Sequence, residues 1–189
     1  QGVAMLVGSL GLHFNVDPPD LEARTITAML KAFVLLEPAL RRATMEGVRT
    51  RRSILAAPFP KGYAQGLTAP GYWPDMTTFA ADYLAANPTR DRGLDLLPIL
   101  LHLDPARVRA RLPYEKISGR PVLHYRLPLA RVSVEGWSIA ADWNRWVAIE
   151  RLAADPERLA ALGSAHQAFA GGDEAWARQV GGALMVAAG

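Results

Sequence analysis

The sequence predicts an α+β domain, because two short strand patterns stand about a hundred residues apart and helical patterns fill most of the chain between and after them. Each strand pattern alternates apolar and polar residues, so neighbouring side chains point to opposite faces of a sheet. The chain has 189 residues, and 50% of them are hydrophobic. That size and composition suit one folded domain with a sizeable core, which we place at residues 1–189.

Residues 9–17 form the first strand pattern. Its apolar face carries three side chains: Leu12, Phe14 and Val16. Its polar face carries three others: His13, Asn15 and Asp17. A face that only meets solvent usually shows Thr, Lys, Glu and Ser, so a histidine followed by an asparagine two residues later indicates a binding surface.

Residues 121–127 form the second strand pattern. Leu123, Tyr125 and Leu127 share its apolar face, and His124 and Arg126 share the other. If the two strands pair, both histidines and the arginine lie on one face of a sheet. Imidazole is a common metal ligand, and the planar guanidinium binds phosphate, so this face is suited to a metal and a phosphate.

A long amphipathic helix is expected over residues 18–45. Asp17 is placed to cap it and Pro18 to occupy its first position. For Asp17, capping is therefore favoured over metal binding. Pro38 is expected to kink or shorten this helix.

The remaining elements are expected to be mostly helical. We expect helices at 75–86, 94–103, from 104 onward, 137–153, from 155 onward and 173–187, with a further short strand at 130–134. Within the helix at 137–153, Trp143 and Trp146 both fall on the side that should face the core.

Residues 47–74 contain many glycines and prolines, so no long regular element is expected there. The segment also holds four aromatic residues, which a disordered linker seldom does. We therefore expect an ordered loop that covers the polar face of the sheet and carries Arg51 and Arg52.

The composition limits the possible chemistry. The absence of cysteine removes disulfides and thiolate chemistry and leaves His, Asp and Glu as metal ligands. The sequence shows neither an apolar run of membrane-spanning length nor a signal peptide, so we expect a cytoplasmic protein without a membrane partner. The 18 arginines and three lysines are dispersed, as expected from the codon bias of a GC-rich bacterium. A nucleic-acid binder would concentrate its charge, so nucleic acid is not an expected partner.

Three segments resemble the amidoligase family of the glutamine synthetase and glutamate–cysteine ligase superfamily. These are residues 11–16 with the helix that follows, residues 116–128 and residues 142–152. The resemblance runs from about residue 9 to 170, and the order and spacing of the segments carry most of its specificity. It implies an antiparallel sheet with helices on one face, as in the C-terminal part of a glutamine synthetase-like catalytic domain.

The resemblance also implies roles for residues of this chain. Arg126 matches the arginine that stabilises the transferring phosphoryl group, and His13 matches a metal-binding histidine. His124 stands where the superfamily usually has a metal-binding glutamate. Cofactor binding is implied for three more residues: Asn15, Arg51 and Arg52. The superfamily strand with paired glutamates is expected before Gln1, so the 189 residues are expected to be a fragment, inactive alone.

The implied reaction is ATP-dependent amide formation between a carboxylate and an amine, with an acyl phosphate intermediate and Mg²⁺ or Mn²⁺ on the phosphates. The expected substrates are small molecules or peptides, and the chain could form a homo-oligomer. One alternative is a catalytically silent binding or scaffold module of the same fold. A second is a basic nucleic-acid binder, whose affinity would depend strongly on salt.

Overall fold

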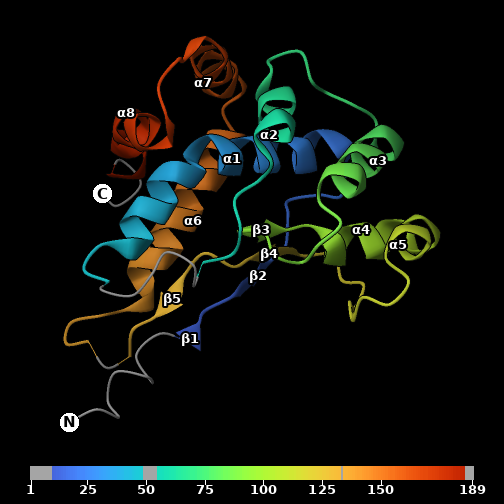
Figure 1. Cartoon of the computed structure of the whole chain (residues 1–189), viewed down its shortest axis with the longest axis horizontal. Helices are drawn as coiled ribbons and strands as arrows, with labels where there is room; N and C mark the ends of the chain where they lie inside the picture. Colours follow the sequence, from blue (N-terminus) through green and yellow to red (C-terminus); the bar gives the residue numbers. More distant parts are fainter. Residues whose placement is uncertain (1–9, 49–54, 133, 186–189) are drawn as a thin grey trace.

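The computed structural model describes residues 10–48, 55–132 and 134–185, and it confirms the α+β class (Figure 1). Five short strands form two antiparallel sheets in this part of the chain. Strand β1 (Leu10–Gly11) pairs with β5 (Leu129–Ala130). The other sheet has the order β2 (Phe14–Val16), β4 (Leu123–Tyr125) and β3 (Leu94–Asp95). The first strand pattern of the sequence is thus divided between the two sheets.

Helices make up most of the described chain, and most of them lie on one side of the three-stranded sheet (Figure 1). They are α1 (Ala23–Met45), α2 (Lys61–Thr68), α3 (Met76–Ala86), α4 (Leu97–Leu103), α5 (Pro105–Arg111), α6 (Ile139–Ala153), α7 (Pro156–Ala168) and α8 (Asp173–Met185). Aspartate caps explain three of the starts. The side chains of Asp75, Asp104 and Asp155 accept backbone N–H groups at the beginnings of α3, α5 and α7.

Helix α1 is the central element of the core, and α6, α7 and α8 all pack against it. The indole Nε1 of Trp176 in α8 donates a hydrogen bond of 2.8 Å to the carbonyl oxygen of Leu35 in α1. Pro38 lies inside α1, but the helix continues to Met45. Pro38 therefore does not shorten the helix, whose end agrees with the expected residue 45, because packing on several sides outweighs the lost backbone hydrogen bond.

The start of α1 also differs from the expected position. The helix begins at Ala23 rather than at residue 18, and Asp17 does not cap it. Pro19 disfavours helical backbone at Pro18, so two successive prolines keep this segment out of the helix. The Asp20 carboxylate instead accepts the N–H of Glu22 at 2.9 Å.

The helix expected at 94–103 begins three residues late. Leu94 and Asp95 form β3, which pairs antiparallel with β4. Helix α4 starts only at Leu97, whose N–H donates to the Asp95 carboxylate at 3.0 Å. The apolar run that begins at Leu94 is compatible with a strand or a helix, and pairing with β4 makes its first two residues a strand.

Residues 55–74 do not cover the polar face of the sheet, so that expectation is wrong for the described part of the segment. They include a regular helix, α2, and their aromatic rings pack on the helical side. The ring of Phe59 lies 6.1 Å from Phe33 and 6.4 Å from Tyr83. Burial of these rings in the core outweighs the turn-forming residues around them. Arg51 and Arg52 lie outside the described residues.

Only one of the two tryptophans assigned to the inner side of α6 is in the core. Trp146 is fully buried, whereas Trp143 is 45% exposed and meets the ring of Phe14 edge-on at 5.6 Å. Trp143 lies near the start of α6, over the end of the core at edge strand β2, so solvent reaches one side of it. None of the described helices is both long enough and apolar enough to cross a membrane.

Gly93 should tolerate no side chain, because a Cβ there would lie 2.8 Å from Leu127 Cγ and 2.9 Å from Phe33 Cζ. We expect Gly93→Ala to lower the free energy of unfolding by roughly 1–3 kcal/mol. Urea denaturation measures this change. Gly66→Ala is the matched control, since nothing lies within 4 Å of that position in α2. It should stabilise the protein by up to about 1 kcal/mol. Equal stability of the two variants would contradict the tight packing around Gly93.

Candidate active site on the polar face of the sheet

Three polar side chains form a row across the three-stranded sheet. Asn15 pairs with His124, and His124 pairs with Asp95. Residues directly opposite each other in an antiparallel sheet have side chains on the same face. The neighbouring row, Phe14, Tyr125 and Leu94, therefore points to the opposite face, where the helices pack.

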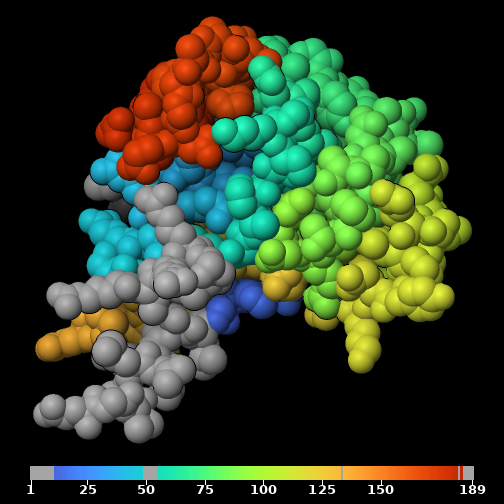
Figure 2. All heavy atoms as spheres, in the orientation of Figure 1, coloured from blue at the N-terminus to red at the C-terminus, as the bar shows by residue number. Residues whose placement is uncertain are grey.

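His13 and Arg126 extend this polar face by one more row. Continuing the register of β2 and β4 brings His13 opposite Arg126, and the Arg126 N–H donates to the Gly93 carbonyl at 2.8 Å. The imidazole rings of His13 and His124 meet edge-on, with their centroids 5.0 Å apart. The predicted pairing of the two strands, with both histidines on one face, is confirmed. The blue N-terminal strands reach the surface on the side away from the red C-terminal helices (Figure 2).

Asp95 is the buried anchor of this face. Its side chain is fully buried, with one carboxylate oxygen 3.4 Å from His124 Nδ1 and 3.8 Å from Arg90 Nε. The other oxygen accepts the Leu97 N–H. A buried carboxylate is costly unless it is paired and hydrogen-bonded, and Asp95 meets both conditions. It turns Nδ1 of His124 toward itself, so only Nε2 of that ring is left for a ligand.

Arg126 and Arg90 place two guanidinium groups beside the histidines. A terminal nitrogen of Arg126 donates to the carbonyl oxygen of Arg90, while a terminal nitrogen of Arg90 donates to the carbonyl of Lys116 at 2.8 Å. These bonds fix both guanidiniums at the edge of the face. The Nε atoms of both arginines are buried and have no hydrogen-bond partner among the described residues. The positive charge of the two guanidinium groups makes the face suitable for an anion.

His13 sits in this positive environment as a neutral imidazole near pH 7. Partial burial lowers its pKa below the usual 6.5, and the neighbouring His124, Arg126 and Arg90 lower it further. The Nε2 atom lies only 3.2 Å from where a Cβ on Gly11 would be, so a side chain at that position would crowd the ring. A neutral imidazole can ligate a metal or accept a proton.

The described residues do not complete a magnesium site. Among residues 10–48, 55–132 and 134–185, no group of three or more His, Asp or Glu side chains is arranged to hold a metal. Mg²⁺ prefers oxygen ligands, whereas His13 and His124 offer nitrogen. The nearby carboxylate of Asp95 already bonds a backbone N–H and two cationic or titratable side chains. The face therefore offers two of the ligands that a metal would need, beside two arginines.

Sequence patterns located four of the six residues of this arrangement. They placed His13, Asn15, His124 and Arg126 together, and the structure agrees on their positions. They missed Asp95 and Arg90. A strand of two residues has no detectable period, and the apolar run after Asp95 favoured a helix. An aspartate between Leu94 and Leu96 is the one signal that marked this position.

Comparison with known families agrees with this geometry. The family described as "Putative amidoligase enzyme" matches residues 6–148, which is more than half of the chain and includes every strand of its described part. The chain therefore belongs to the amidoligase family, whose members are described as ligase-type enzymes. Comparison with curated proteins and with solved structures found no match.

The positive charges around His13 predict a measurable titration. The NMR midpoint of His13 should lie below 6.5, and Arg126→Gln should move it upward by removing one of the charges. The midpoint should stay below 6.5, because partial burial is the largest cause. Since folding lowers this pKa, protonation favours the unfolded chain, so stability is lost as the pH falls below about 6.5.

The control for this titration is Arg120→Gln, which removes an exposed arginine that is not among the charges lowering the pKa of His13. A chelator in all samples removes free metal ions from the comparison. An unchanged His13 midpoint in Arg126→Gln, or a wild-type midpoint above 6.5, would contradict the arrangement described here.

Proposed function

We propose that the protein is an ATP-dependent carboxylate–amine ligase that forms an amide through an acyl phosphate. Family membership supports amide ligation in general. The observation that carries the finer proposal is the polar face itself. There, His13, His124 and Arg126 lie together at the surface, with Arg90 beside them and the buried Asp95 beneath.

The proposed reaction has two steps. A carboxylate oxygen first attacks the γ-phosphorus of ATP, so that a C–O–P linkage forms as the bond to ADP breaks. The amine nitrogen then attacks the acyl carbon, forming the C–N bond and expelling inorganic phosphate, and the nitrogen loses a proton. Both steps carry negative charge on phosphoryl oxygens, which a positioned guanidinium stabilises.

In this proposal, Arg126 is the catalytic arginine and Asn15 binds substrate or nucleotide. The bond from Arg126 to the Arg90 carbonyl fixes the guanidinium before substrate arrives, so little reorganisation is needed during reaction. Asn15 is exposed on the same face, next to His124. Arg51 and Arg52, proposed to bind cofactor, lie outside the described residues.

The proposed cofactors are ATP and a divalent ion, Mg²⁺ or Mn²⁺. His13 and His124 would contribute imidazole ligands to the ion, and imidazole suits Mn²⁺ better than Mg²⁺. The other ligands would be phosphate oxygens, water or residues beyond those described. When bound, the ion would neutralise phosphate charge, and no step above is assigned to it.

The proposed substrates are a carboxylate and an amine, each a small molecule or a peptide. The same proposal includes a cytoplasmic location and leaves homo-oligomerisation open. Both are testable by fractionation and by sedimentation.

Arg126 should be the residue whose replacement reduces turnover most while leaving the fold intact. Its side chain lies on the polar face, so removing it opens no apolar cavity. We expect Arg126→Ala to lower turnover by about a hundredfold or more. Arg126→Lys should also fail, because an ammonium group does not reproduce the planar fork. The measurement is ATP-dependent release of ADP and phosphate by the full-length protein with candidate amines and carboxylates.

Arg120→Gln is the matched control for the Arg126 variants and should keep wild-type turnover. Thermal unfolding of each variant separates a loss of chemistry from a loss of fold. A well-folded Arg126→Ala protein with undiminished turnover would identify Arg126 as a structural residue only.

The alternative is a catalytically silent binding or scaffold module of the same fold. The incomplete ligand set among the described residues favours this alternative, since ATP chemistry requires a divalent ion. Nucleotide binding distinguishes the two functions. The ligase predicts calorimetric binding of ATP with Mg²⁺ or Mn²⁺ by the full-length protein, and the silent module predicts none.

A further inference from the structure

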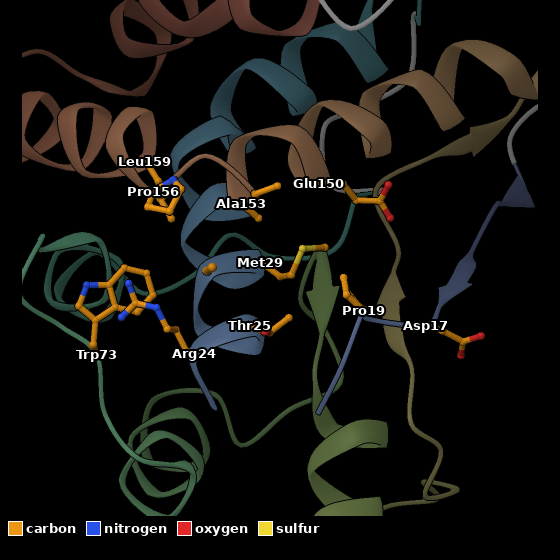
Figure 3. Close-up of a pocket in the computed structure, with 12 residues that line it drawn as sticks. Asp17, Pro19, Arg24, Thr25, Met29, Trp73, Glu150, Ala153, Pro156 and Leu159 are labelled. Carbon is orange, nitrogen blue, oxygen red and sulfur yellow. The ribbon is translucent and has the colours of Figure 1, made fainter. Parts of the chain in front are cut away.

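A cavity lies on the helical side of the molecule, outside the polar face. Its volume is about 490 Å³, within the range of small-molecule pockets. The first turns of α1, the end of α6 and the start of α7 form its walls (Figure 3). Its floor is apolar, built from Ala28, Met29, Ala153 and Leu159.

Arg24 and Trp73 form one side of this cavity (Figure 3). The guanidinium carbon of Arg24 lies 4.6 Å from the centre of the indole ring. The ammonium nitrogen of Lys31, two turns further along α1, lies 4.1 Å from the same ring. Lys31 also donates to the Ala69 carbonyl at 2.8 Å, which ties the segment carrying Trp73 to α1. This side of the cavity is therefore a fixed aromatic surface with a guanidinium against it.

The two cations on this side lack a counter-charge. Among the described residues, no carboxylate forms an ion pair with Arg24 or Lys31. Lys31 is buried, and burial together with the charge of Arg24 lowers its pKa to about 8. Arg24 is exposed and lines the cavity, so its guanidinium can be reached by a ligand. Arg24 and Lys31 repel each other, and no described carboxylate pairs with either of them. An anion bound beside Arg24 would offset this repulsion.

The other side of the cavity carries two acids, Asp17 and Glu150. Their carboxylates lie on the side of the view away from Trp73 (Figure 3). Glu150 accepts the indole N–H of Trp146 at 2.6 Å, which fixes its carboxylate there. A ligand with an anionic group at both ends would meet these acids, whereas one with a single anionic end would not.

We propose that this cavity binds a small monocarboxylate with an apolar body, its carboxylate on Arg24 and its body between Trp73 and the apolar floor. The charge-assisted bond to Arg24 orients the ligand, and burial of the apolar body supplies most of the affinity. The site is separate from the polar face and does not depend on the proposed ligase activity.

Calorimetric titration of the full chain with three eight-carbon probes tests the site. Octanoate should bind saturably with one site per chain. Suberate, which carries a second carboxylate, and 1-octanol, which carries none, should both bind at least about tenfold more weakly. Equal binding of octanoate and 1-octanol would overturn the role of Arg24, and absence of saturable octanoate binding would overturn the site.

Variants of the cavity walls complete the test. Arg24→Gln should weaken octanoate binding by about tenfold while leaving the fold unchanged, since Arg24 is exposed. Arg120→Gln, which removes an arginine outside the cavity, should bind octanoate like the wild type. Ala153→Leu should also weaken binding by filling the cavity, with 1-octanol affected equally. Octanoate affinity that is unchanged in both Arg24→Gln and Ala153→Leu would overturn the proposal.

Discussion

The packing of Tyr125 at the centre of the three-stranded sheet is the contact on which the rest of the structure depends. Its fully buried ring meets Phe14 from β2, Phe33 from α1 and Trp146 from α6. These contacts join the sheet to two helices through one side chain. Because side chains alternate along a strand, burying Tyr125 also forces His124 and Arg126 onto the opposite face. The core and the candidate site are thus two results of the same register.

The polar face in turn depends on a buried charge beneath it, the carboxylate of Asp95. Asp95 is fully buried, and its carboxylate contacts Arg90, His124 and the backbone of Leu97. Each contact offsets part of the cost of burying the charge, and together they hold the side chains of Arg90 and His124 near one another. Without that carboxylate, the guanidinium of Arg90 would lose its ion-pair partner on this face. The polar face thus has a buried anion, Asp95, beneath it and an exposed surface with two arginines that attracts anions.

The sequence was sufficient to predict the α+β class, the pairing of the two patterned strands and most of the helices, since these follow from periodicity and from aspartate caps. It was also sufficient to place His13 and His124 on one face. It could not predict β3, because a two-residue strand is determined by its partner β4 rather than by its own residues. The contribution of Asp95 and Arg90 to the site was missed for the same reason. The segment at 55–74 was misplaced because glycines and prolines predict an irregular backbone, but not whether the aromatic rings pack on the polar face or the helical side of the sheet.

The hydrogen bond from Trp176 to Leu35 connects residues 141 positions apart in the chain. Because the chain is synthesised from its N-terminus, the two partners of this bond are made at different times. Helix α1 is synthesised well before α8, which packs against it, so in the interval the apolar surface of α1 lacks that cover. During that interval the nascent chain must keep the apolar surface of α1 from associating with other chains. Contacts of such long sequence separation also slow the search for the native state, so α1 is open to association with other chains until α8 has packed against it.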